Sequence, residues 1–297
     1  MSAHAQEPEA PAADAPAFPT SAIYIAELGW SDGIPSVDAI VVPDHGPEGY
    51  VNQPYFCQGS KLYFYSASKG GNKTDIYMGS HGVTTVDIQV TDTPDRSEYS
   101  PKCAPEEKTI SFIQESPDAS LTTLNQMRLS EGEGEQVITL APLGYYAWFN
   151  DGADVAVFLR SNPATLFAVN VETDAFELIA ENIGRALFSS PDGKDVYFTT
   201  AIGEGDFQVN KYSSATKSID VVRALPSGSQ DYAVFAGPDG DDLLLSASGN
   251  ILYMAPATSN GDWLPLEGFD IAEKLTVNRL AISSDLSTLA FVVAEVE

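Results

Sequence analysis

Basic residues are scarce in this chain, and long apolar runs are missing. Only 15 of the 297 residues are Lys or Arg, against 42 Asp or Glu, which gives a formal net charge of -27. A surface this acidic repels phosphate backbones and anionic lipid, so neither nucleic acid nor a membrane surface is expected as a partner. No apolar run approaches the ~20 residues that a bilayer-spanning helix needs, so no membrane insertion is expected. Solubility is the simplest role for the acidity.

Motifs for catalysis and for metal binding are missing as well. The sequence contains no Gly-x-Ser-x-Gly nucleophile elbow and no glycine-rich phosphate loop. Its three histidines lack the spacing of a metal site. The acid-rich pieces 131–135 and 239–242 lack the register of a calcium loop and are interpreted as solvated turns. These absences favour a protein that binds without catalysing.

Residues 1–20 are predicted to be a tail outside the folded domain. Ser2-Ala3-His4-Ala5-Gln6 resembles the small-residue end of a signal peptide, with cleavage after Ala5. Glu7–Thr20 is rich in Ala, Pro and acidic residues, a composition that cannot build a core. We therefore expect an exported protein, periplasmic or secreted, whose signal peptide was trimmed; a disordered tail of a cytosolic protein is the alternative.

What the chain does contain is a repeated β-hairpin. Its clearest copy spans Arg185–Thr200, where Pro191-Asp192-Gly193 forms a turn between two apolar, β-branched and aromatic segments. Equivalent apolar positions on the second strand of each copy are Phe64, Phe112, Phe158, Phe198, Leu245 and Phe291. Their spacings are 48, 46, 40, 47 and 46 residues. Such a period, built of short strands, is typical of propeller blades of about four strands each.

The repeat predicts an all-β six-bladed propeller over residues 21–297, with four antiparallel strands per blade. Five complete blades cover roughly residues 50 to 275. The remaining pieces complement each other: Asn278–Val293 supplies two inner strands, whereas Ala22–Ile25 and Pro35–Val42 supply two outer ones. Joined, they make a sixth blade shared between the two ends of the chain, which removes an open sheet edge.

Cys57 and Cys103 precede the hairpin turns of adjacent blades. Equivalent positions on neighbouring blades can lie close enough for a disulfide, and export would permit one. Two buried free thiols are the alternative, and the sequence leaves both open.

Several of these residues resemble a known family. Pro191-Asp192-Gly193-Lys194 with Val196-Tyr197-Phe198, the related Pro238-Asp239-Gly240, and Thr74-Asp75-Ile76-Tyr77 are similar to the blade motif of TolB-type six-bladed propellers. The resemblance covers nearly the whole chain after Ser21 and implies that fold. TolB carries an additional N-terminal α/β domain for which this chain has no room, so its envelope partnership is not carried over. Similar propellers also occur on prolyl-oligopeptidase-type enzymes, whose hydrolase domain has no counterpart here.

The central channel of the propeller is the expected binding site, because the first strands of all six blades converge there. The predicted channel-mouth residues are Asn52, Gln53, Glu98, Tyr146, Arg185, Asp231, Tyr232, Asn278 and Arg279. Amides, charged groups and tyrosines at one mouth suit a polar ligand. Alternatively, Glu98 and Asp231 pair with Arg185 and Arg279 and fill the channel.

The sequence favours a monomeric, exported, non-catalytic propeller, without a cofactor, that recognises a protein, peptide or glycan of the cell envelope in its channel or on one face. A calcium-dependent lactonase or esterase is the alternative, with an axial metal held by Asn52, Glu98, Asp231 and Asn278. Arg185 and Arg279 would oppose a cation in that space. A structural propeller that uses its outer faces is a third hypothesis.

Overall fold

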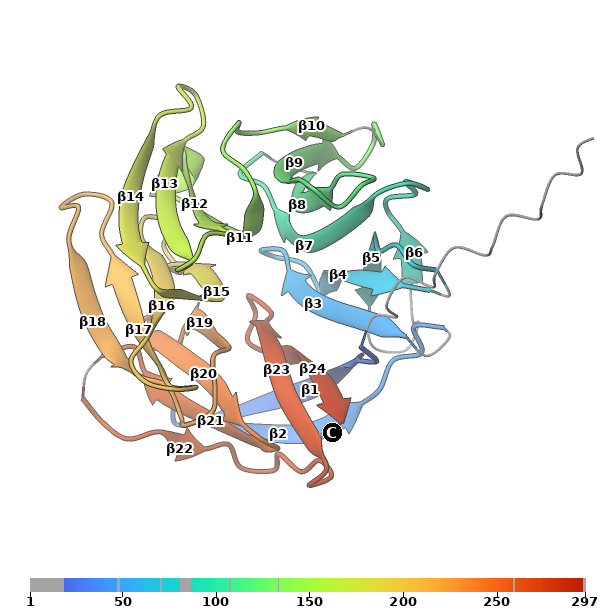
Figure 1. The fold of residues 1–297 in the computed structure, drawn as a ribbon. Helices are drawn as coiled ribbons and strands as arrows, with labels where there is room; N and C mark the ends of the chain where they lie inside the picture. The colour runs from blue at the N-terminus through green and yellow to red at the C-terminus, as the bar shows by residue number, and fades with distance from the viewer. Residues whose placement is uncertain are drawn as a thin grey trace, which may run out of the picture.

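Six four-stranded antiparallel sheets surround a central axis in the computed structural model (Figure 1). The structure describes residues 19–46, 49–69, 71–80, 87–106, 108–132, 134–258 and 260–295. The predicted all-β six-bladed propeller with four antiparallel strands per blade is confirmed. Of the predicted tail, residues 1–18 lie outside the described residues, as do His81 and part of the strand predicted over residues 84–90. No helix among the described residues is long and apolar enough to cross a membrane.

Within each blade the strands run in sequence from the axis outward, except in the blade that closes the ring. Their bounds, blade by blade, are β3 (Tyr50–Phe56), β4 (Leu62–Ser68), β5 (Asp75–Ser80), β6 (Asp87–Gln89); β7 (Ser97–Cys103), β8 (Thr109–Glu115), β9 (Thr122–Arg128), β10 (Gly134–Gln136); β11 (Leu143–Phe149), β12 (Asp154–Leu159), β13 (Thr165–Asn170), β14 (Phe176–Glu181); β15 (Ile183–Ser189), β16 (Val196–Ala201), β17 (Phe207–Tyr212), β18 (Ile219–Ala224); β19 (Tyr232–Ala236), β20 (Asp242–Ser248), β21 (Ile251–Pro256), β22 (Leu264–Pro265); and β23 (Leu275–Ile282), β24 (Thr288–Glu295), β1 (Ala22–Ser31), β2 (Ile34–Val41). A single 3₁₀ turn, Asn150–Gly152, follows β11.

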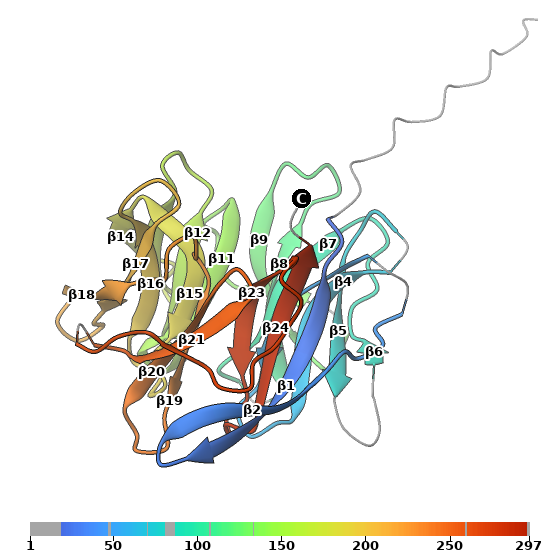
Figure 2. The same cartoon turned by 90° about the horizontal axis from the view of Figure 1, so that it is seen from below.

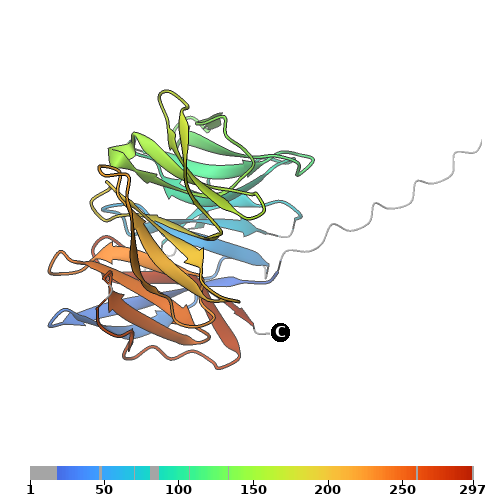
Figure 3. The same cartoon turned by 60° about the vertical axis from the view of Figure 1, so that its left-hand side comes forward.

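Burial follows the position of a strand within its blade. In β4 every residue after Leu62 is buried, and in β24 the first six residues are buried. Neighbouring blades cover both faces of these second strands, so their side chains are buried in succession rather than at alternate positions. The outermost strands β6 and β10 are exposed throughout. Figure 3 shows the sheets following one another around the ring, and the core lies between them.

The ring closes between the two ends of the chain. β1 pairs with β24 in antiparallel register, with Ala22 opposite Val293, Tyr24 opposite Phe291 and Glu27 opposite Thr288. Figure 2 shows β1 and β24 side by side in this blade. The predicted shared blade is confirmed, with its inner strands from the C-terminal part and its outer strands from the N-terminal part.

The Pro191-Asp192-Gly193 turn links β15 to β16 as predicted. Asp192 Oδ1 accepts hydrogen bonds from Ser190 Oγ at 2.5 Å and from the Lys194 amide at 3.2 Å. Gly193 has a φ of 76°, a left-handed conformation that glycine adopts at little cost. Side-chain capping and glycine together explain why this copy of the repeat is the clearest in the sequence.

Cys57 and Cys103 are joined by a disulfide, with their Cα atoms 5.7 Å apart. Cys57 follows β3 and Cys103 ends β7, so the bond connects the innermost hairpins of two adjacent blades. The structure thus has the disulfide, rather than the two free thiols that the sequence left open.

Candidate functional site

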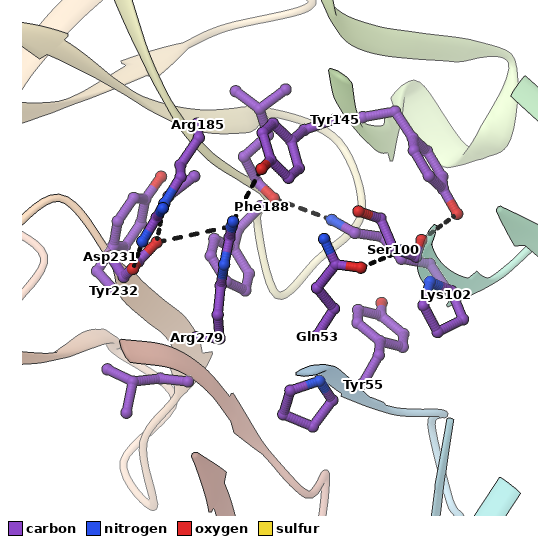
Figure 4. A pocket seen from close by; sticks show the side chains of 16 residues that line it. Gln53, Tyr55, Ser100, Lys102, Tyr145, Arg185, Phe188, Asp231, Tyr232 and Arg279 are labelled. Atoms are coloured by element: carbon purple, nitrogen blue, oxygen red, sulfur yellow. Dashed lines mark hydrogen bonds and ion pairs between the residues drawn. The ribbon is translucent and has the colours of Figure 1, made fainter. Parts of the chain in front are cut away.

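Three connected hollows lie along the propeller axis. The narrowest has a volume of ≈ 70 Å³ and we call it the waist. The side chains that line it include Gln53, Tyr55, Ser100, Lys102, Tyr145, Arg185, Phe188, Asp231, Tyr232 and Arg279 (Figure 4). On one side it opens into a hollow of ≈ 410 Å³ at the starts of the first strands, which we call the polar mouth. On the other side it opens into a hollow of ≈ 370 Å³ at their ends, which we call the apolar funnel.

Irregular pairing in the first strands brings side chains into the waist. In five blades, the register between the first and the second strand shifts at or next to the channel. The first strands concerned are β3, β7, β11, β15 and β23. At these shifts Gln53, Ser100 and Arg279 have φ values of 59°, 53° and 52°. A bulge places an extra residue in one strand and redirects its side chain. The bulges therefore select which residues face the axis.

A partly buried ion-pair network spans one side of the waist. Arg185 donates to Asp231 through two atoms, Nε to Oδ1 at 3.1 Å and Nη2 to Oδ2 at 2.5 Å. Arg279 Nη1 lies 3.7 Å from Asp231 Oδ1, and its Nη2 donates to Tyr145 Oη at 2.8 Å. Although burial acts to raise the pKa of Asp231, the two guanidinium groups outweigh it and lower that pKa. One carboxylate thus serves two arginines, and the network carries net positive charge.

Lys102 lies on the opposite side of the waist without a carboxylate partner among the described residues. Its Nζ donates to the carbonyl oxygen of Leu187 at 3.0 Å. The same nitrogen lies 5.4–5.7 Å from the ring centroids of Tyr55, Tyr146 and Phe188. Burial, with Arg279 as a smaller cause, lowers the pKa of Lys102 to about 7.

Replacing Lys102 with Met is expected to stabilise the propeller. The ordinary pKa of 10.5 falls to about 7 on folding, so holding a proton on this amine costs free energy at and below pH 7. That cost shrinks as the pH rises from 7 toward 10.5, because the folded amine is then already neutral. We expect Lys102→Met to gain about 3 kcal/mol at pH 6 and little near pH 10, measured by urea unfolding. Lys61→Met, at a 73% exposed side chain, is the control and should change little. A less stable Lys102→Met at pH 6 would contradict this cost.

The remaining waist residues are held by hydrogen bonds between blades. Gln53 Oε1 accepts from the Ser100 amide at 2.7 Å and from Ser66 Oγ at 3.1 Å. Tyr146 Oη donates to the Ser100 carbonyl oxygen at 3.0 Å and contacts Ser111 Oγ at 2.9 Å. Since Trp148 Nε1 also donates to Ser111 Oγ, Tyr146 and Trp148 share one face of β11, as their alternation predicts. Tyr146 is thus a buried residue whose ring forms part of the waist wall.

The structure brings most of the predicted site residues together. Gln53, Tyr146, Arg185, Asp231, Tyr232 and Arg279 line the waist. Asn52 and Asn278 line the polar mouth. Asn52 Nδ2 donates to Ser21 Oγ at 3.2 Å, which ties the first blade to the start of the closing one. The predicted pairing of Asp231 with both arginines is present.

The placement of Glu98 at the channel mouth, and its pairing with arginines, is wrong. Its carboxylate accepts hydrogen bonds from Thr93 Oγ1 at 2.5 Å, Gln114 Nε2 at 3.1 Å and Thr91 Oγ1 at 3.3 Å. The residue is completely buried, and burial raises the pKa of this carboxyl. The physical reason is the bulge in β7, which begins after Tyr99, so the side chains that reach the axis are those of Ser100 and Lys102.

The predicted calcium ligands do not converge. Asn52 and Asn278 lie at the polar mouth, Glu98 is bonded away from the channel, and Asp231 is held by Arg185 and Arg279. No group of three or more His, Cys, Asp or Glu side chains suited to a metal occurs in the described part of the chain. The oxygen donors that a calcium ion requires are therefore not assembled from this set.

Lys102, Tyr55 and Phe188 also line the waist, although they were not predicted from the sequence. A usable signal existed for Lys102. Pro54 stands three residues before Cys57 and Pro101 two residues before Cys103, and each proline is followed at once by a residue of the waist. Aligning the prolines, rather than the strand starts, would have placed Lys102 beside Tyr55.

Comparison with known proteins identifies the fold. No protein-family model matches the sequence, and no curated protein sequence matches it. Among solved structures, a protein designated TolB from Agrobacterium tumefaciens superposes with a TM-score of 0.65 at 14% identity, over 92% of this chain and 97% of that one. TolB from Acinetobacter baumannii gives a TM-score of 0.56 at 13% identity over 92% of this chain. The chain has the fold of a TolB-type six-bladed propeller.

This chain spans 64% of the length of the Acinetobacter TolB chain. This chain is also similar to a chain in a nidogen–laminin complex, with a TM-score of 0.56 at 10% identity, over 74% of this chain and 81% of that one. At identities of 10–14%, these similarities establish the fold alone. The chemistry of the channel has to be argued from its own residues.

Proposed function

We propose that this TolB-type propeller is a non-catalytic binding protein that recognises an acidic peptide segment of a partner protein at its polar mouth. The observation that carries the proposal is a concentration of positive charge in an acidic chain. Three of its 15 basic residues, Arg160, Arg185 and Arg279, line this one hollow of ≈ 410 Å³, with Glu115 as the carboxylate beside them. Guanidinium groups bind carboxylates through two parallel hydrogen bonds, which favours an acidic peptide over a neutral glycan.

The remaining lining suits a peptide backbone. Asn52 and Asn278 supply amide groups, and Tyr50, Tyr99 and Tyr145 supply rings with hydroxyl groups. Fixed polar groups around a concave hollow orient a ligand, and the aromatic walls contribute contact area. The Asp231 network holds Arg185 and Arg279 in place before a ligand arrives, which lowers the entropic cost of binding.

The partner is proposed to lie in the cell envelope or outside the cell. The Cys57–Cys103 disulfide supports this, because such bonds persist mainly in oxidising compartments. The acidity of the chain supports the choice of the polar mouth as the binding site, since an acidic segment is repelled elsewhere and is drawn to the positive mouth.

A test is selection of displayed random peptides on the immobilised propeller, followed by affinity measurement on Arg160→Gln. Arg160 is exposed at the rim, so its loss should leave the fold intact. We expect acidic peptides to be enriched and to bind Arg160→Gln about tenfold more weakly, with affinity that falls as salt rises. Arg128→Gln, at an exposed arginine paired with Glu106 away from the channel, is the matched control. Enriched peptides that lack acidic residues, or that bind Arg160→Gln as tightly as the wild type, would refute the proposal.

A further inference from the structure

The apolar funnel lies at the opposite end of the channel from the polar mouth and has different chemistry. Four blades contribute large apolar side chains to its walls: Phe56, Phe188, Phe235, Ile282 and Leu286. Uncharged polar side chains, those of Gln58, Ser189, Ser190, Ser283 and Ser284, line it as well. The charged side chain among its lining residues is that of Lys102, at the inner end where the funnel meets the waist. A hollow that combines a cluster of apolar side chains with a single cation at its inner end suits a ligand with an apolar body and one anionic end.

Lys102 has unused capacity for such an anion. An ammonium group has three donors, and one hydrogen bond, to the carbonyl oxygen of Leu187, is present. Its positive charge otherwise faces the rings of Tyr55, Tyr146 and Phe188. These rings stabilise a cation by less than a carboxylate in the same place would.

The charges around the waist also leave room for one more anion. Arg185, Arg279 and a protonated Lys102 carry three positive charges, against the single carboxylate of Asp231. Figure 4 shows Lys102 and Arg279 extending into the channel from different blades. A carboxylate placed between them would be attracted by both, in surroundings where screening by water is weak.

Two buried hydroxyl groups at the waist lack hydrogen-bond partners as well. Ser100 Oγ and Tyr232 Oη are each buried without a partner in the structure, and both residues line the waist. Buried polar groups without partners are costly, and a ligand or ordered water normally satisfies them.

We propose that the apolar funnel binds a linear aliphatic carboxylate, with its hydrocarbon chain in the funnel and its carboxylate at the waist beside Lys102. This site goes beyond the proposed function, because it takes a small molecule from the other face of the propeller. It shares Arg279 with the peptide site but does not use Arg160. The funnel's ≈ 370 Å³ is in the range of small-molecule pockets.

Binding at this site takes up a proton above neutral pH. The charged and titratable groups that face Lys102 from the packed strands are Tyr55 on β3, Tyr146 on β11, Arg185 on β15, Asp231 and Tyr232 at β19, and Arg279 on β23. The tyrosines have raised pKa values and Asp231 a lowered one, so Lys102 is the member of this group that titrates between pH 6 and 8.5. A carboxylate favours the protonated amine, so affinity should be greatest below pH 7 and fall as the pH rises.

The experiment is calorimetric titration of the full chain with octanoate, and with octanamide as an uncharged match, at pH 6 and pH 8.5. We expect octanoate to bind at least tenfold more tightly than octanamide at pH 6. Its affinity should be roughly tenfold or more weaker at pH 8.5, with proton uptake visible as a dependence of the measured heat on the buffer. These measurements use the wild-type chain, so they do not depend on whether a variant folds.

Lys102→Met should bind octanoate at least tenfold more weakly at pH 6 and lose the pH dependence, whereas Lys61→Met should match the wild type. If octanoate and octanamide bind with equal affinity, or if Lys102→Met binds octanoate as tightly as the wild type, the hydrocarbon chain alone accounts for binding and the proposal is overturned. No detectable octanoate binding by the wild type would also overturn it. Arg160→Gln should bind octanoate normally, so failure of this site and failure of the peptide site can be told apart.

Discussion

A chain that ends at Thr276 is expected to lose the folded ring rather than one blade. Such a chain lacks β24 and most of β23, and with them the strand to which β1 is hydrogen-bonded. The residues Leu289–Val293 are at most 4% exposed and pack against neighbouring sheets on both sides. Burying their four larger apolar side chains contributes roughly 6–12 kcal/mol, which is comparable to the whole stability of an ordinary domain.

Far-UV circular dichroism melting and size-exclusion chromatography measure the outcome. The shortened chain should show no cooperative melt, or should oligomerise through the open edge of β1. Adding a peptide of residues 275–295 should restore the melt, because closure of the ring needs no covalent link. The same peptide with Phe291→Asp is the control and should not restore it, since Phe291 is completely buried. An unchanged melt of the shortened chain would show that the closing blade is dispensable.

Asp231→Asn is expected to destabilise the propeller by about 3–5 kcal/mol at neutral pH. The substitution removes the carboxylate that neutralises Arg185 and Arg279 but leaves both guanidinium groups in place. The folded pKa of Asp231 is lowered, so its stabilising contribution is fully present above the unfolded pKa of about 3.9 and is lost as the pH falls through the folded value. The difference between variant and wild type should therefore be constant from pH 5 to 8 and shrink in stronger acid.

Urea unfolding at several pH values tests this, with Asp239→Asn on the exposed turn between β19 and β20 as the matched control. The double variant Asp231→Asn with Arg185→Gln should recover part of the loss, because it also removes one of the two unneutralised charges. If the double variant is less stable than Asp231→Asn alone, loss of shape rather than loss of charge balance explains the effect.

The two ends of the channel explain why one network serves both proposed sites. Asp231 sits between Arg185, which also lines the polar mouth, and Arg279, which reaches Tyr145 across the waist. A peptide at the mouth and a carboxylate in the funnel would approach these arginines from opposite sides. Lys102 belongs to the funnel side alone, so its replacement separates the two sites experimentally.

Much of the fold followed from the sequence because its signals are local and repeated. Each second strand is buried on both faces, so large apolar residues such as Phe64 and Phe291 recur in it at similar spacing along the chain. Two strands were then left over at each end of the chain, and these predicted one closing blade shared between the two ends. No knowledge of side-chain contacts was needed for this prediction. The Pro191-Asp192-Gly193 turn could be recognised for the same reason, since its backbone preferences lie within the turn.

The side chains that reach the axis were decided by the tertiary structure. Alternation along a regular strand predicts that the Glu98 side chain faces the axis. Because β7 has a bulge after Tyr99, the side chains of Ser100 and Lys102 face the axis instead. Where a bulge forms depends on pairing with the second strand and on packing against the next blade, which a single strand's sequence does not encode. The same holds for the charge balance of the waist. The sequence pointed to Asp231, Arg185 and Arg279 as channel residues. Their convergence from three blades showed that two arginines share one carboxylate, and that Lys102 has no carboxylate partner among the described residues.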